Sequence, residues 1–213
     1  LLREVPGTVG GLILARFDRL DTIQRRVLQA ACVIGRQFSL PVLRSVLAPM
    51  DESDFTTCLT QLVERDFVTP NPETPETDYD FRHVIVSDAI YSTLLRRDRA
   101  ELHGQVGEAI ERTYADRIDS QVDLLARHYA WSTRKDRALH YLILAGQKAA
   151  RSYLNSQARQ YFQDALNLLP QVNHSPRQAL QTHQGLGDLL VHSGEYPTAR
   201  QHYQTALDRI SGD

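Results

Sequence analysis

The chain of 213 residues is poor in the residues that cross-link small proteins or ligate metals. It has two cysteines, one methionine and one tryptophan. Cys32 and Cys58 are too few for a disulfide scaffold or a zinc site, which needs several ligands at short spacing. Both stand at helical spacing among apolar neighbours, so we interpret them as small core residues. The eight histidines lack the spacing of paired metal ligands, and we predict no metal site.

Long apolar runs and an excess of one charge are also lacking. The chain has 24 basic and 26 acidic residues, a net charge of −2, and no apolar run long enough for a membrane span. We therefore expect neither a membrane protein nor a basic field that attracts nucleic acid. The amino terminus, Leu1-Leu2-Arg3, has no signal-peptide layout, which makes the cytoplasm the expected compartment. It also has no initiating methionine, which favours an excised piece of a longer protein.

Signatures of catalysis are missing as well. Three glycines fall within residues 7–11, but a phosphate-binding loop requires a lysine after its last glycine, and residues 12–14 continue an apolar face instead. Ser87 and Cys58 lie on helical patterns without the glycine-rich turn that exposes a nucleophile. We therefore predict no catalytic residue in this chain and no cofactor that it binds alone.

Helical periodicity dominates what is present in the first part of the chain. Apolar residues recur three and four positions apart, as on one face of a helix. Gly35 suits the end of one such stretch. Ser39 suits the start of the next, and either Asp51 or Ser53 suits the start of the one after it. The pattern predicts helices over residues 6–20, 21–34, 39–47 and about 51–66.

Two short extended segments follow these helices, Phe67–Thr69 and Tyr79–Phe81, joined by a loop with three prolines and no apolar residue. Three helices and a two-stranded wing predict a winged-helix domain over residues 21–82, preceded by a linker helix within residues 1–20. A winged helix can read DNA with its third helix. Here residues 51–66 carry five acidic residues and one arginine, which opposes DNA binding because phosphates would be repelled.

From His83 to the carboxy terminus the pattern is almost entirely helical, and it contains an internal repeat. Small and large residues alternate in a fixed scheme that occurs twice and is typical of tetratricopeptide repeats, where small residues let paired helices approach and aromatic rings fill the grooves. The predicted fold class is all-α with a minor β wing: a winged-helix domain followed by a tetratricopeptide-like α-α superhelix over residues 83–213, with more repeats expected beyond it. The first unit of the repeat has Ala145-Gly146, Ala149, Tyr153, Ala158, Phe162, Ala165 and Pro170; the second has Leu186-Gly187, Leu190, Gly194, Tyr196, Ala199, Tyr203 and Ala206.

Most aromatic residues of this arm fall at packing positions of the repeat, and we interpret them as core. Any that remain on the concave face would line a groove for a peptide or a partner domain. The residues concerned are Tyr129, Trp131, Tyr141, Tyr153, Tyr161, Tyr196 and Tyr203.

One histidine stands at a distinctive junction. Residues 79–91 predict a strand that leads into a helix, with His83 between the two. Together with Arg-Phe-Asp-Arg-Leu at 16–20, residues 30–38 and Leu-Leu-Arg-Arg at 94–97, this stretch resembles the carboxy-terminal region of STAND/AAA-type signalling ATPases. The match is to the bacterial members attached to class III nucleotide cyclases or to LuxR-type and maltose-type regulators, and the resemblance spans nearly the whole chain.

The resemblance implies a regulatory and protein-interaction segment without enzyme activity of its own. His83 would donate a hydrogen bond to the β-phosphate of ADP in an upstream nucleotide-binding domain, so ATP or ADP would be bound by the parent protein only. A protein or peptide partner on the repeats would then weaken this clamp. Taken alone, His83 also fits a helix-capping or packing residue. A DNA-binding transcriptional regulator with a repeat sensor and a plain tetratricopeptide scaffold stay open as alternatives.

Overall fold

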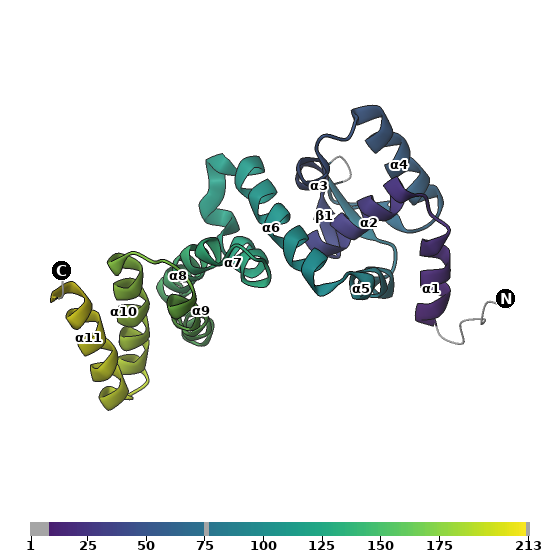
Figure 1. Cartoon of the computed structure of the whole chain (residues 1–213). Helices are drawn as coiled ribbons and strands as arrows, with labels where there is room; N and C mark the ends of the chain where they lie inside the picture. Colours follow the sequence, from purple (N-terminus) through teal and green to yellow (C-terminus); the bar gives the residue numbers. More distant parts are fainter. Residues whose placement is uncertain (1–8, 75–76, 212–213) are drawn as a thin grey trace. The chain divides into compact units, whose positions relative to one another are not determined.

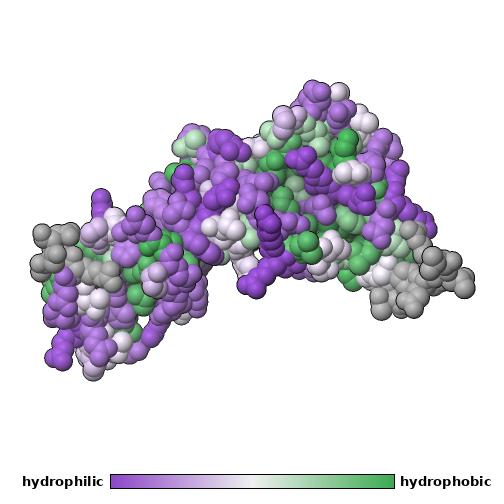
Figure 2. Space-filling model, viewed as in Figure 1, coloured by the Kyte–Doolittle hydropathy of each residue, from purple (hydrophilic) through white to green (hydrophobic). Residues whose placement is uncertain are grey.

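The computed structural model describes residues 9–74 and 77–211 of the chain. They form a predominantly helical protein with one small sheet, which confirms the all-α class with a minor β part. The chain divides into two compact units, one that ends at Ala115 and one that begins at Asp116 (Figure 1). In each unit polar residues cover most of the face drawn in Figure 2, and apolar residues are exposed between them.

The first unit contains six helices and three strands within the described residues. Most of the predicted ends agree with the structure to within about two residues; the start of the first predicted helix lies outside the described residues. The elements are α1 (Val9–Asp18), α2 (Thr22–Ile34), β1 (Gln37–Ser39), α3 (Leu40–Leu47), α4 (Glu52–Glu64), β2 (Val68–Pro70), β3 (Asp78–Phe81), α5 (Val84–Thr93) and α6 (Arg96–Thr113).

Local signals account for the course of α2. The carboxylate of Asp21 accepts a hydrogen bond from the Gln24 backbone, and the Gln24 side chain accepts one in return from the Asp21 backbone. The Gln24 amide is buried and donates to Gln61 of α4, so the same residue closes a cap and joins two helices. The predicted apolar stripe is buried from Val27 onward, but Ile23 is exposed.

The sheet has one strand more than the sequence predicts. Its order is β1-β3-β2 and both pairings are antiparallel, with Phe38 opposite Tyr79 and Thr69 opposite Asp80. β1 has three residues, too short a run for a period-two pattern to be visible. The buried Phe38 ring meets the Phe81 ring at 5.6 Å between centroids, which anchors β1 to β3.

The predicted caps of the next two helices are correct in place but not in chemistry. Ser39 and Asp51 stand at the N-caps of α3 and α4, yet neither side chain makes a capping hydrogen bond. The Ser39 hydroxyl lies 2.9 Å from the hydroxyl of Tyr114, and this tertiary contact replaces the local one. A distant partner therefore decides what the serine does.

Helices α5 and α6 pack with the first unit: α5 contacts α1 and α2, and α6 contacts α2 and α3. They are joined to each other by Tyr91, whose hydroxyl lies 2.9 Å from His103 Nε2 and whose ring lies 4.1 Å from the Arg99 guanidinium carbon. The sequence assigns residues 83–115 to the repeat arm, whereas by compactness they belong to the first unit. The functional bounds at residues 82 and 83 stay a prediction.

The second unit is built from antiparallel helices that follow one another through short links (Figure 1). A 3-10 segment precedes the first of them, and a second, single-turn one follows Leu168. The helix α10 begins at Pro176 and ends at His192, and Ser175 and Gln178 form a capping box at its start. The elements are η1 (Ala115–Gln121), α7 (Val122–Trp131), α8 (Lys135–Arg151), α9 (Asn155–Leu168), η2 (Leu169–Gln171), α10 (Pro176–His192) and α11 (Tyr196–Ser211).

Two glycines of the repeat scheme lie against aromatic rings of neighbouring helices, whereas Tyr153 and Tyr196 of the scheme are exposed. A Cβ on Gly146 of α8 would lie 2.9 Å from the Phe162 ring of α9, and one on Gly187 of α10 would lie 2.6 Å from the Tyr203 ring of α11. Gly185, which the scheme does not include, faces the Phe162 ring from the other side. These contacts require glycine because any side chain would occupy the space of a ring.

Both cysteines are buried free thiols, which confirms their interpretation as core residues. Burial raises the pKa of Cys32 to about 12 and that of Cys58 to about 11, so both stay protonated and unreactive at neutral pH. In the described part of the chain, no helix combines the length and the apolar character needed to cross a bilayer.

Candidate functional site

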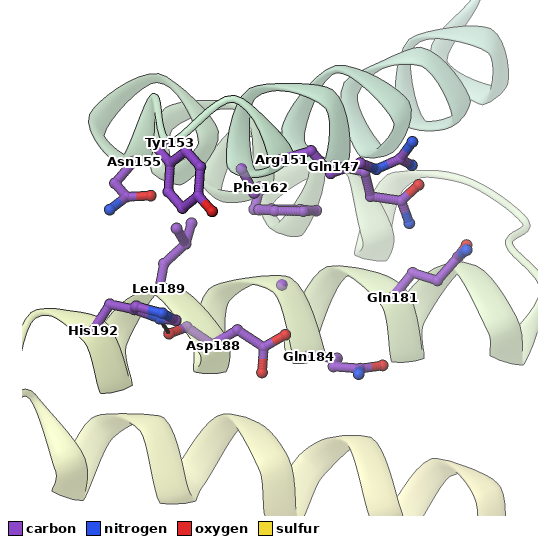
Figure 3. Close-up of a pocket in the computed structure, with 12 residues that line it drawn as sticks. Gln147, Arg151, Tyr153, Asn155, Phe162, Gln181, Gln184, Asp188, Leu189 and His192 are labelled. Atoms are coloured by element: carbon purple, nitrogen blue, oxygen red, sulfur yellow. Dashed lines mark hydrogen bonds between the residues drawn. The ribbon is translucent and has the colours of Figure 1, made fainter.

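A groove of about 520 Å³ lies between α8 and α10 in the second unit. We call it the α8–α10 groove. Its base is the ring of Phe162, which is held between two glycines and is almost fully buried. Figure 3 shows Gln147, Arg151 and Gln181 gathered toward one end, with Tyr153, Leu189 and His192 toward the other. Asn155 also lies toward the end of Tyr153, so polar groups line both ends of the groove and the apolar side chains lie toward one.

The hydrogen-bonding groups of this groove are available to a ligand. Five of its lining side chains make no hydrogen bond or ion pair to any residue that the structure describes. Unpaired polar groups beside an apolar base favour a ligand that supplies both donors and acceptors. These five are Gln147, Arg151, Asn155, Gln181 and Gln184.

One carboxylate of the groove is already held in place. The Tyr203 hydroxyl donates to Asp188 Oδ1 at 2.6 Å, and His192 Nδ1 lies 2.7 Å from the Asp188 carbonyl. Burial and the Asp188 carboxylate together raise the pKa of Tyr203 to about 12, so its hydroxyl stays a donor. Asp188 thus forms a fixed acceptor between α10 and α11.

The rim of the groove carries a backbone outlier. Tyr153 follows α8 with φ of 59°, in the left-handed region that glycine normally occupies, and its side chain is 88% exposed. Holding an exposed aromatic residue there costs free energy without gaining core packing, and such outliers concentrate at functional sites. Leu154 beside it is also exposed. The rim therefore offers apolar surface next to the amide groups.

The arrangement suits an extended peptide. Asn and Gln side chains each donate and accept, as the peptide groups of an extended segment do. The exposed ring of Tyr153 can receive an apolar side chain. A highly charged ligand such as a nucleotide fits less well, because Arg151 is offset by the carboxylate of Asp188.

The sequence-predicted site residue, His83, lies in the first unit. It is the N-cap residue of α5 in extended conformation, its side chain makes no capping hydrogen bond, and the residue is exposed. Val84 and Ile85 follow it on the surface at 49% and 45% exposure. The helix-capping interpretation of the imidazole is therefore wrong for this structure, and burial in an apolar interior is excluded. Its predicted contact with a phosphate stays a prediction.

The prediction that the aromatic residues of the repeats are mostly core is correct in part. Tyr129 and Tyr141 are buried and stacked on each other, with ring centroids 5.5 Å apart. Trp131, Tyr153 and Tyr196 are instead exposed by 64%, 88% and 65%. Each stands at a helix end or in a link, where the helical period no longer decides which way a side chain points.

A pair of histidines joins the two helices next to the groove and makes stability depend on pH. His183 Nδ1 of α10 and His202 Nδ1 of α11 lie 3.0 Å apart, a contact in which one ring must donate and the other accept. Burial lowers the pKa of His202 below its ordinary value of 6.5. The unfolded chain therefore binds more protons than the folded one as pH falls below that value, so stability is lost on acidification.

We expect the midpoint temperature of thermal unfolding of the second unit to be lower at pH 5.5 than at pH 7.5. His202→Gln should reduce this pH difference, because the titrating group is gone. The matched control is His174→Gln, which removes a half-buried histidine outside α10 and α11 and should leave the difference unchanged. An equal pH difference in both variants would show that the histidine pair has no part in it.

Comparison with known proteins shows one curated relative at low identity. The chain is similar to an uncharacterized protein of Rhizobium meliloti (strain 1021), with 29% identity over 164 residues. The match covers 77% of this chain and 16% of that protein, so the chain spans a small part of the length of its relative. No family model matches the chain, and no solved structure matches it significantly.

Within residues 9–74 and 77–211, no three His, Cys, Asp or Glu side chains are placed so that they could hold a metal ion. The α8–α10 groove and the surface around His83 belong to different units. The sequence predicts a groove on the repeats but not its lining, because four amides and an arginine spread over residues 147–184 form no recognisable motif.

Proposed function

We propose that this chain is the regulatory and protein-interaction segment of a STAND-type signalling ATPase. In this proposal the α8–α10 groove binds a peptide segment of a partner or inducer, and His83 contacts ADP held by an upstream nucleotide-binding domain. The observation that carries the proposal is the set of partnerless amides around an aromatic base, which fits an interaction module.

The element order of the first unit supports the winged-helix part of the proposal. Three helices, α2, α3 and α4, lead into the antiparallel pair β2 and β3, and β1 joins the far side of β3. This order is compatible with a winged helix whose first short strand lies between two helices. The exposed residues of α4 include Glu52, Asp54 and Glu64, so the surface a DNA reader would use is acidic. A role in DNA binding is therefore not proposed.

The pairing of glycines with rings supports the tetratricopeptide part. Phe162 meets Gly146 within one helix pair, and Tyr203 meets Gly187 within the next. The groove then lies between α8 and α10, the first helices of the two proposed repeats, which face the concave side in such arrays.

The surface around His83 supports the nucleotide part. An exposed imidazole with no partner among the described residues can donate an N–H to a phosphate. The exposed Val84 and Ile85 beside it give a neighbouring domain apolar surface to bury. Partner binding on the second unit would then shift the equilibrium between a closed, ADP-bound state and an open one.

The test uses the protein that includes the upstream nucleotide-binding domain. His83→Ala should lower the amount of ADP that stays bound through purification and raise the signalling activity of the parent protein without inducer. The reason is that the closed, ADP-bound state loses a hydrogen-bond donor to the nucleotide. His174→Ala, at a half-buried histidine of the second unit, should change neither quantity. Unchanged ADP retention in His83→Ala would remove this residue from the mechanism and favour a plain scaffold.

A second experiment tests whether the α8–α10 groove binds a peptide. Random short peptides are selected on the wild-type chain, and the selected peptides are titrated against the triple variant Gln147→Ala, Gln181→Ala, Gln184→Ala. We expect the affinity of these peptides to fall by about tenfold or more in the variant. Peptides that bind both chains equally would place the interaction surface elsewhere.

A further inference from the structure

The first unit contains a small cavity whose lining is dominated by positive charge. It lies where the end of α1 meets the end of α4, has a volume of about 220 Å³, and is lined by Arg16, Arg19, Leu20, Arg65 and Phe67. We call it the arginine pocket. Arg65 is 49 residues from Arg16 in sequence, so the fold brings these charges together.

The three guanidinium groups of the pocket are not neutralised by the chain itself. No carboxylate lines the cavity, and in the part of the chain that the structure describes none of the three arginines has an ion-pair partner. Asp66, which follows Arg65, lies 4.0 Å from Arg82 instead. Three like charges around one cavity repel one another, and a bound anion would turn this repulsion into attraction.

One of the arginines is held in place before any ligand arrives. Nη2 of Arg16 donates to the backbone carbonyl of Arg65, and the Arg16 guanidinium carbon lies 5.0 Å from the centre of the Phe67 ring. Phe67 itself is buried, so it supplies an apolar wall that cannot hydrate an ion. A guanidinium fixed by stacking keeps further N–H donors for a ligand and loses little entropy on binding.

We propose that the arginine pocket binds a phosphoryl group, as inorganic phosphate or as the phosphate of a small ester. Guanidinium groups form paired hydrogen bonds with the oxygens of a phosphate. Several guanidinium groups can neutralise a phosphate dianion, whereas one is enough to neutralise a carboxylate. The volume holds one such group and its point of attachment, not a whole nucleotide.

A nucleic-acid backbone is disfavoured at this pocket because the neighbouring α4 exposes Glu52, Asp54 and Glu64. The proposal does not rest on the coupling to ADP that is proposed for His83.

The experiment titrates the 213-residue chain with inorganic phosphate and with pyrophosphate by calorimetry at pH 7.5 and low salt. Arg19→Gln and Arg65→Gln should each weaken phosphate binding by about tenfold or more, because each removes a guanidinium that has no structural partner here. Arg16→Lys tests geometry, since it keeps the charge but loses the fork. The matched control is Arg26→Gln, an exposed arginine of α2 outside the pocket, with the same change in net charge.

Further arms separate the sources of binding. Acetate, a monoanion, should not compete with phosphate, and a DNA duplex should bind no better to the wild type than to Arg19→Gln. Absence of phosphate binding would overturn the proposal. So would an equal loss in Arg26→Gln, which would indicate general attraction of anions. Thermal unfolding curves with and without phosphate report the same interaction independently, because a ligand of the folded state raises its midpoint.

Discussion

Replacing Phe162 by alanine is expected to destabilise the second unit by about 3–5 kcal/mol, the largest effect among our predictions. The ring is almost fully buried between Gly146 and Gly185 and packs within a cluster of buried side chains on α8, α9 and α10. The two glycines have no side chains that could move into the space left behind, so the cavity would persist. A loss of this size is a large fraction of the roughly 5–15 kcal/mol that stabilises a typical domain.

The change is measured by urea denaturation of the wild-type and variant chains, followed by circular dichroism. Gln163→Ala is the matched control, since Gln163 is the exposed next residue of the same helix and should shift the midpoint little. A Phe162→Ala chain as stable as the control would mean that the helices close around the gap, and that the glycines do not hold the ring in place.

Adding a methyl group on the other side of the same contact should also destabilise the unit. A Cβ on Gly185 would overlap the Phe162 ring, and a rigid ring wedged between two helices has little room to move. Overpacking of this kind costs about 1–3 kcal/mol. It outweighs the gain of about 1 kcal/mol that alanine brings over glycine in a helix interior. We therefore expect a net loss of stability in Gly185→Ala.

The control for Gly185→Ala is Gly10→Ala, because Gly10 lies in α1 with open space around it. At Gly10 the new methyl group meets no other atom, so alanine changes only the helix propensity. The stability of Gly10→Ala should therefore equal or exceed that of the wild type. The double variant Phe162→Ala, Gly185→Ala should be less destabilised than the sum of the single changes, since the new methyl group occupies part of the cavity. Strict additivity would show that the two residues do not share a contact in solution.

Elements that depend on residues close together in the sequence were predictable, and elements that depend on distant residues were not. The helix α10 was predictable to the residue, since Ser175, Pro176 and Gln178 mark its start and the apolar period carries it to its end. The strand β1 was not, because its three residues take their conformation from hydrogen bonds to β3, about 40 residues further along the chain. The capping role assigned to Ser39 failed for a similar reason, its hydroxyl being paired with that of Tyr114.

The candidate sites show the same division. The repeat scheme marks Gly146 and Phe162 as packing positions, and the structure shows that they contact each other. The groove amides and the arginine pocket carry no such periodicity. Gln147 and Gln181 face one groove, and Arg16 and Arg65 one cavity, only because packing brings separate helices together.

The amino-acid sequence by itself determined the helical class, the ends of most helices and the exclusion of a disulfide scaffold, since all of these depend on residues near one another or on composition. The tertiary structure alone decided that residues 83–115 pack with the first unit, that Trp131 and Tyr153 are exposed, and which polar groups are left without partners. The physical reason is that burial and hydrogen-bond pairing are properties of the packed chain, in which each side chain competes for partners supplied by distant segments.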